Sequence, residues 1–115
     1  MTIPESGVLL RIFIGESDRW QGKPLYEAIV LKARELHLAG ATVLRGPMGF
    51  GANSRLHTTK ILRLSEDLPM VIEIVDSREK IETLLPHLDQ MVNEGLVTLE
   101  NVRVYRYRAS DQPKP

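Results

Sequence analysis

Short apolar runs alternate with longer amphipathic stretches along the chain, and this pattern predicts four strands and two helices. Residues 8–14, 41–45 and 70–75 are apolar and rich in β-branched side chains, which is typical of strands. A fourth strand is predicted at 99–107. After the first and third strands, apolar residues recur every three or four positions, which predicts an amphipathic helix in each interval. The predicted order is strand, helix, strand, strand, helix, strand.

Proline, glycine and serine mark the ends of the two predicted helices. Pro24 suits the first turn of a helix, where no backbone N–H donor is needed, and Gly40 is expected to end that helix. Ser77 is expected to cap the second helix, which Gly95 ends. Pro86 lies inside the second helix and removes one backbone hydrogen bond at a cost of about 3 kcal/mol. We therefore expect a kink or an early break there.

This order of elements predicts an α+β ferredoxin-like βαββαβ fold. Two helices would cover one face of a four-stranded antiparallel sheet with the spatial strand order 4-1-3-2. We expect residues 1–7 to form an N-terminal lead-in, 8–108 to form the domain and 109–115 to form a flexible tail. Residues 52–68 are expected to form a long mobile loop, and loops of that length are uncommon unless they have a function.

Side chains alternate across a strand, so the two faces of the predicted sheet can be compared. One face is apolar and is expected to lie under the helices: Val8, Leu10, Ile12, Ile14, Met70, Ile72, Ile74, Val102 and Val104. The other face is half apolar: Leu9, Arg11, Phe13, Val71, Glu73, Val75, Arg103, Tyr105 and Tyr107. Arg11, Glu73 and Arg103 lie in its middle and could pair. With no further layer to cover it, this face would expose an apolar patch, which usually marks an interface; the alternative is a solvated sheet face.

The composition is that of an ordinary globular domain. The chain has 115 residues, of which 43% are hydrophobic and 26% charged, and its formal net charge is zero, so no overall field attracts nucleic acid or an anionic membrane. It has no cysteine, which excludes disulfides and thiolate chemistry. No apolar run approaches the ~18 residues of a membrane span, and the N-terminus lacks a signal-peptide pattern, so we expect a cytoplasmic protein without membrane insertion.

Two cationic segments stand out against this neutral total. Residues 45–63 and 102–108 contain no acid, so an anion site should involve them. In the first segment, the glycine-rich run at 46–51 could offer backbone amides to an anion, although its spacing fits neither a P-loop nor a dinucleotide fingerprint. In the second, Arg106 and Arg108 suit an anionic ligand at a sheet edge, or are solvated strand-end cations.

The sequence contains no legible catalytic group. His37, His57 and His87 are twenty and thirty residues apart, too far for a helical metal site, and no Gly-x-Ser-x-Gly elbow is present. Tyr105 and Tyr107 alternate with arginines and could bind RNA on an open sheet, but no RNA-recognition signature accompanies them. We expect no enzyme activity, no cofactor, no resident metal and no nucleic-acid partner.

Several segments resemble the PII signal-transduction proteins. The run at 41–51, with its Gly-Phe-Gly, resembles their second strand and the base of their long T-loop, and Arg106-Tyr107-Arg108 resembles their terminal Arg-x-Arg. Residues 70–76, followed by an amphipathic helix, resemble their third strand. The runs at 15–26 and 60–70 are more specific and resemble the uncharacterised PII-like family called domain of unknown function 190 (DUF190).

This resemblance covers residues 8–108 and implies a homotrimer whose sheets face inward and whose ligand clefts lie between subunits. Each cleft would use the loop base of one chain and the terminal arginines of its neighbour. The implied ligand is a small anionic metabolite, an adenine nucleotide in PII proteins, and loop 52–68 would report its binding to an unidentified target protein. The implied ligand-binding residues are Arg45, Gly46, Gly49, Phe50, Gly51, Arg106 and Arg108.

The chain departs from the PII pattern at three places, of which the first is one additional residue at the strand-to-loop junction before Gly-Phe-Gly. PII proteins bind phosphates with a B-loop rich in glycine and lysine, whereas residues 93–98 are short and carry only the charge of Glu94. This disfavours a triphosphate and leaves a smaller anion, a monophosphate or a cyclic nucleotide open. No tyrosine lies between Gly51 and Leu68, so uridylylation of the loop is not expected.

Two other functions remain as alternatives. One is a trimer that binds a divalent cation, similar to the CutA copper-tolerance proteins, with His57 and carboxylates such as Glu16 or Asp18 as ligands. The other is a ferredoxin-like enzyme with a loop that closes over its ligand, which no acid–base constellation supports.

Overall fold

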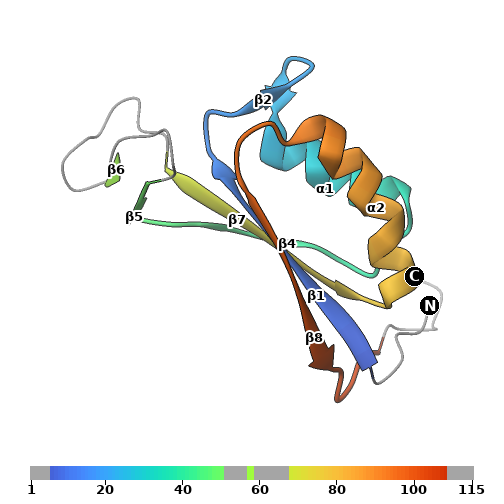
Figure 1. The fold of residues 1–115 in the computed structure, drawn as a ribbon. Coiled ribbons are helices and arrows are strands. Elements are labelled where there is room, and N and C mark those ends of the chain that lie inside the picture. The colour runs from blue at the N-terminus through green and yellow to red at the C-terminus, as the bar shows by residue number, and fades with distance from the viewer. Residues whose placement is uncertain (1–5, 51–56, 59–67, 109–115) are drawn as a thin grey trace, which may run out of the picture.

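The computed structural model describes residues 6–50, 57–58 and 68–108, and these form a four-stranded sheet with two helices on one face, together with two two-stranded sheets (Figure 1). The sheet has the strand order β4-β7-β1-β8, and each neighbouring pair is antiparallel. This confirms the ferredoxin-like α+β fold and the predicted spatial order. In chain order the elements are β1 (Ser6–Gly15), β2 (Arg19–Trp20), β3 (Lys23–Pro24), α1 (Leu25–Glu35), β4 (Thr42–Arg45), β5 (Met48–Gly49), β6 (His57–Thr58), β7 (Pro69–Asp76), α2 (Arg78–Met91) and β8 (Leu96–Arg103).

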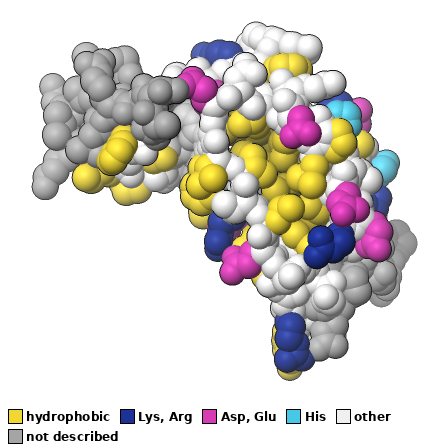
Figure 2. Space-filling view, viewed as in Figure 1, with side chains coloured by type: hydrophobic (Ala, Val, Ile, Leu, Met, Phe, Trp, Pro, Cys, Tyr) yellow, Lys and Arg dark blue, Asp and Glu magenta, His cyan; other side chains and the backbone are white. Residues whose placement is uncertain are grey.

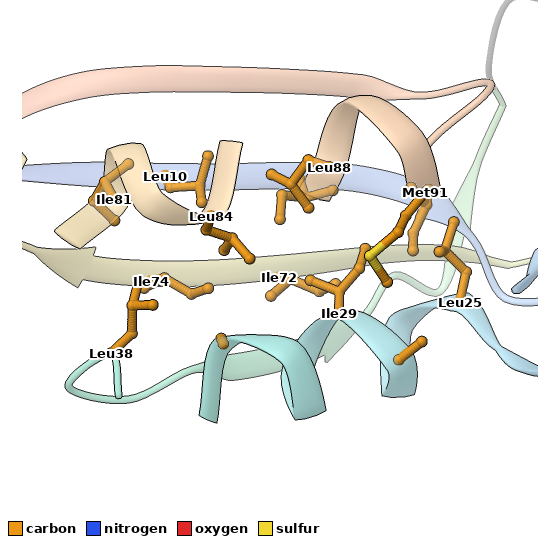
Figure 3. Close-up of a cluster of buried hydrophobic side chains, with 14 of the residues drawn as sticks. Leu10, Leu25, Ile29, Leu38, Ile72, Ile74, Ile81, Leu84, Leu88 and Met91 are labelled. Carbon is orange, nitrogen blue, oxygen red and sulfur yellow. The ribbon is translucent and has the colours of Figure 1, made fainter. Parts of the chain in front are cut away.

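The hydrophobic core lies between the two helices and the central strands β1 and β7 (Figure 3). Alternate residues of both strands are buried there, as the sequence predicts. Leu10, Ile72, Ile29 and Leu84 are at most 1% exposed and come from β1, β7, α1 and α2. Burying each such side chain contributes about 1.5–3 kcal/mol to folding, so this packing fixes the helices on the sheet.

Each helix differs from its prediction at one point: α1 ends earlier than expected, and α2 is not broken at its proline. Helix α1 ends at Glu35 rather than at Gly40, and His37 adopts the left-handed conformation with φ of 66°. Helix α2 is capped by Ser77, as predicted, and runs through Pro86 to Met91, so the early break does not occur. The buried leucines on either side of the proline explain this, because their packing outweighs one lost backbone bond: Leu84 and Leu88.

A buried carboxylate joins α2 to the segment before β4. Asp76 is 1% exposed, and its side chain accepts hydrogen bonds from the Ala39 amide at 2.8 Å and the Ser77 amide at 2.7 Å. Such bonds satisfy the oxygens of a buried polar side chain, which would be costly to bury without partners. Asp76 therefore fixes the backbone at Ala39, which matters for the pocket described below.

The last strand lies at Leu96–Arg103 rather than at the predicted residues 99–107. β8 starts directly after Gly95, whose φ is +154° and where a Cβ would meet the Phe13 carbonyl at 2.7 Å, and it ends at Arg103 rather than at 107. In its register with β1, Val102 lies opposite Gly7, on the face away from the helices. The predicted placement of Val102 and Val104 under the helices is therefore incorrect, since Val104 lies beyond the strand.

The error arises because β8 is an edge strand that the helices do not cover. Val97 and Leu99 lie on its helix side and are still 38% and 51% exposed. Figure 2 shows hydrophobic side chains gathered between α2 and β8. Since neither side of β8 is buried, its apolar positions carry no signal for which side faces the helices.

The sheet face away from the helices, which we call the open face, combines an ion-pair cluster with apolar residues. Arg11 pairs with Glu73 at 2.8 Å and with Glu100 at 3.6 Å. The hydrogen bond to Glu73 and the charges of both carboxylates raise the pKa of Arg11 above its ordinary value, although desolvation acts against them. Arg11 and Glu73 pair as predicted, but Glu100 replaces Arg103 as the third member. The strand register places these apolar residues on the open face: Leu9, Phe13, Leu44, Val71, Val75, Leu96 and Val102.

Two short hairpins were not predicted. Arg19–Trp20 pairs with Lys23–Pro24 through a turn in which Gln21 and Gly22 have φ of 49° and 83°, the geometry that favours tight hairpins. Met48–Gly49 pairs with His57–Thr58, and this pair projects away from the main sheet (Figure 1). Neither helix of the described residues is long and apolar enough to cross a membrane.

Candidate functional site

The first group of predicted ligand residues lies where β4 ends, and we call it the loop base: Arg45, Gly46 and Gly49. Arg45 is the last residue of β4, and its guanidinium forms an ion pair with Glu16, which follows β1. The Gly46 amide donates a hydrogen bond to the Pro69 carbonyl at 2.7 Å. An anion at the loop base would therefore have to compete with acceptors that the protein already supplies.

The glycines of the loop base lie against Pro69. A Cβ at Gly46 would be 2.8 Å from Pro69 Cγ, and a Cβ at Gly49 would be 3.0 Å from the same atom. The close approach of Pro69 to the backbone thus accounts for both glycines without a ligand. Phe50, also predicted to bind ligand, is strongly exposed. Gly51 lies outside the described residues.

The second group of predicted ligand residues lies where the chain leaves β8. The segment Val104–Arg108 leaves that strand and returns toward the start of β4, where the Tyr107 hydroxyl donates a hydrogen bond to the Ala39 carbonyl at 3.3 Å. Figure 2 shows Lys or Arg side chains at the tip of the molecule below β8. The terminal arginines are exposed, and Arg106 lies 5.8 Å from the centre of the Tyr105 ring.

A pocket of about 470 Å³ lies between this terminal segment and the start of β4. Leu9 and Val75 of the open face contribute apolar surface to it, and its polar lining residues are Thr42, Glu73, Arg106 and Tyr107. The pocket is open on one side, so it would enclose a small molecule only together with another surface. The full lining is Leu9, Ala39, Gly40, Ala41, Thr42, Glu73, Val75, Val104, Arg106 and Tyr107.

Of the residues that line this pocket, only Arg106 is among the ligand-binding residues predicted from the sequence. Gly40 was interpreted as a helix end, and because nothing lies within 4 Å of a Cβ added there, no packing requirement in the sequence marks it as part of the pocket. Tyr107 was assigned to the open face, and it does lie over that face, but beyond the end of β8.

The two groups of predicted ligand residues do not meet within one chain. The loop base lies at the end of β4, and the pocket lies at its start. β4 spans four residues, so the strand separates them by roughly 10 Å along its length. The predicted ligand residues thus fall into two groups at opposite ends of the same strand.

The described residues offer no ligand set for a metal ion. No group of three or more His, Cys, Asp or Glu side chains that could hold one occurs among them. Of the carboxylates proposed for the cation-binding alternative, Glu16 pairs with Arg45, and Asp18 accepts the Gly15 amide at 2.9 Å. The side chain of His57 lies outside the described part of the structure.

Comparison with known proteins identifies the family. The model of the DUF190 family, described as "Uncharacterized ACR", matches residues 7–104. The chain belongs to the DUF190 family. A UPF0166 protein of Aquifex aeolicus is 42% identical over 96 residues, which cover 84% of this chain and 90% of the relative. One of Methanocaldococcus jannaschii is 34% identical over 99 residues, covering 85% and 91%.

Solved structures of PII-like proteins have the same fold as this DUF190 chain. CPII of Thiomonas intermedia, bound to ADP, AMP and bicarbonate, aligns with a TM-score of 0.65 at 16% identity and covers 88% of this chain and 90% of its own. A PII-like signalling protein of Thermus thermophilus aligns with a TM-score of 0.63 at 18% identity, covering 90% and 93%. The GlnK–ATP complex of B. subtilis aligns with a TM-score of 0.56 at 10% identity, covering 88% and 85%. The resemblance to PII-like proteins is thereby confirmed at the level of fold.

Proposed function

We propose that this DUF190 chain is a regulatory protein without enzyme activity, which binds an adenine nucleotide in clefts between the subunits of a homotrimer. The observation that carries the proposal is the division of the cationic residues into two partial sites at opposite ends of β4, beside an uncovered sheet face. Neither partial site surrounds a ligand by itself.

The open face supports assembly. Its apolar residues surround the cluster of Arg11, Glu73 and Glu100, and Leu44 and Leu96 on it are about half exposed. Burial of this surface would contribute about 25 cal/mol for each Å² of apolar area. Copies that face one another through their sheets would bury it.

Such an arrangement would also complete the site. A neighbour would bring its terminal segment, with Arg106 and Arg108, toward the loop base at Arg45. The pocket beside Tyr107 has an apolar floor suited to a base, and the arginines suit phosphate oxygens because a guanidinium binds them in a bidentate manner.

The number of phosphates that the site favours follows from its few cations. The connection from α2 to β8 is Val92–Gly95, and it contributes no lysine or arginine to the site. We therefore infer a preference for AMP or ADP over ATP. CPII was solved with ADP and AMP and GlnK with ATP, and both share the fold, so the preference rests on the cations of this chain.

The regulatory output would pass through the segment between Gly49 and Leu68, most of which lies outside the described residues. That segment begins and ends at the loop base, where Gly46 and Pro69 are hydrogen bonded. A ligand that alters this bond would alter how the segment starts, and thereby how it meets a target protein.

Calorimetric titration of ligand-free protein with AMP, ADP and ATP tests this proposal. We expect AMP or ADP to bind, and Arg106→Ala to weaken binding by about 10- to 100-fold, because a charge-assisted hydrogen bond contributes about 1.5–3 kcal/mol. Arg34→Ala removes an equal charge from an exposed position on α1 and serves as the control. Absence of heat with all three nucleotides contradicts the proposal.

A further inference from the structure

The ion pair between Arg45 and Glu16 joins the loop base to the segment that follows β1. The two residues are 29 positions apart in the chain. The side chain of Arg45 is 57% exposed and could reach a ligand, whereas that of Glu16 is 25% exposed and is held closer to the protein. Arg45 therefore already carries an anionic partner at the place where a nucleotide phosphate would need it.

The backbone fixes the position of Glu16. Its amide donates a hydrogen bond to the Leu68 carbonyl at 2.8 Å. Two residues later, Asp18 accepts the Gly15 amide with its side chain at 2.9 Å and the Leu25 amide with its carbonyl at 2.7 Å. These bonds hold the backbone of the loop after β1, so only side-chain freedom is lost when the Glu16 carboxylate meets Arg45.

We propose that Glu16 is an internal competitor for the anion that binds at Arg45. This inference rests on the proposed function, since it concerns the same site. A carboxylate and a phosphate bind a guanidinium through the same donors, so Arg45 cannot satisfy both fully. A carboxylate held in the same molecule competes at a high effective concentration. The apparent affinity for the nucleotide is therefore lower than the free arginine would give.

The competition also links the ligand to a second element. The residues after Glu16 lead within three positions into the β2–β3 hairpin, where Trp20 packs against the core. When an anion takes Arg45, the Glu16 carboxylate is released and the contact between the loop base and this segment is lost. Ligand binding would thus change the contacts of the hairpin segment as well as those of the loop base.

The test compares Glu16→Gln with the wild type by calorimetric titration with AMP and with ADP. The amide keeps the size of the side chain but removes its charge, so we expect binding that is roughly two- to fivefold tighter, the range for a partly exposed ion pair. Glu82→Gln removes the same charge from an exposed position on α2 and is the matched control. It should leave the affinity unchanged.

Two further measurements separate competition at Arg45 from a general effect of charge. In an Arg45→Ala background, Glu16→Gln should no longer improve binding, because the group for which it competes is gone. Trp20 is the single tryptophan of the chain, so its fluorescence reports on the hairpin. The change in emission on adding AMP should be smaller in Glu16→Gln than in the wild type, because the contact that the ligand breaks is already absent.

The outcomes distinguish this inference from the proposed function. If the wild type binds AMP or ADP and Glu16→Gln binds them no more tightly, the internal competitor is refuted while the nucleotide site stands. Equal tightening by Glu16→Gln and Glu82→Gln refutes it too, since the effect is then one of net charge. If neither the wild type nor Glu16→Gln binds any nucleotide, the proposed function fails first.

Discussion

Gly46 and Gly49 illustrate how a single residue type can have a structural and a functional explanation at once. Glycines beside arginines suggest an anion site in the sequence, and Pro69 against both of them gives a packing reason in the structure. The two explanations differ in what they require. A packing role needs only the absence of a side chain, whereas a ligand role needs the amide free, and the Gly46 amide is bonded to Pro69.

Gly46→Ala should lower the free energy of unfolding by about 1–3 kcal/mol, the usual cost of forcing extra volume into a packed site. The proline ring cannot swing away from a Cβ placed 2.8 Å from its Cγ. Urea denaturation followed by circular dichroism measures the loss. Gly40→Ala, where nothing lies within 4 Å of the added atom, is the control. In a Pro69→Ala background the penalty at Gly46 should largely disappear, and an unchanged penalty would refute the packing explanation.

Among the elements, helix α2 has the most explicit start signal. The Ser77 side chain accepts the Lys80 amide at 3.2 Å, and the neighbouring buried Asp76 accepts the Ser77 amide. Together they satisfy donors that the first turn leaves free. Because Asp76 also binds the Ala39 amide, the start of α2 is tied to the wall of the candidate pocket.

Ser77→Ala should cost about 1 kcal/mol of stability, since it removes an N-cap. Ser77→Asn keeps a side-chain acceptor and should retain most of that stability. Midpoints of urea denaturation for the two variants provide the comparison. Equal losses would mean that the cap contributes nothing beyond what Asp76 provides.

At the level of the whole molecule, the two helices pack on one face of the sheet, whereas no element of the described residues covers the open face. The helices bury the side chains of the central strands β1 and β7 on one face (Figure 3). The open face leaves leucines half exposed around Arg11, Glu73 and Glu100. An ion-pair cluster inside an apolar surface gives little stability by itself, but it can fix how copies align when they cover it.

Leu44→Glu should prevent assembly, because it places a charge in the apolar part of the open face. Native mass spectrometry or sedimentation at micromolar concentration should find a trimer for the wild type and a smaller species for the variant. Leu31→Glu on α1 is the matched control, since Leu31 is 44% exposed and Leu44 is 48% exposed. A wild type that is monomeric at this concentration would contradict the trimer.

The spacing of apolar residues was sufficient to predict β1, β7 and both helices, because these elements bury one side and the buried positions recur with the period of the element. The order of strands followed from the ferredoxin-like order of elements along the chain. Reasoning from the apolar spacing failed at β8, an edge strand with two exposed sides, where no such recurrence exists. The β2–β3 and β5–β6 pairs were not predicted either, because strands of two residues are too short to show an alternation of apolar and polar positions.

The sequence by itself therefore determined the fold and the family, and it supplied the hypothesis of an anionic ligand. Only the tertiary structure decided that Glu16 occupies Arg45, that Tyr107 binds Ala39, and that the two cationic groups lie at opposite ends of β4. The physical reason is that these contacts join segments 29 and 68 positions apart. Periodicity reports which side of an element is buried, whereas a contact between distant polar groups depends on where the folded elements bring the chain.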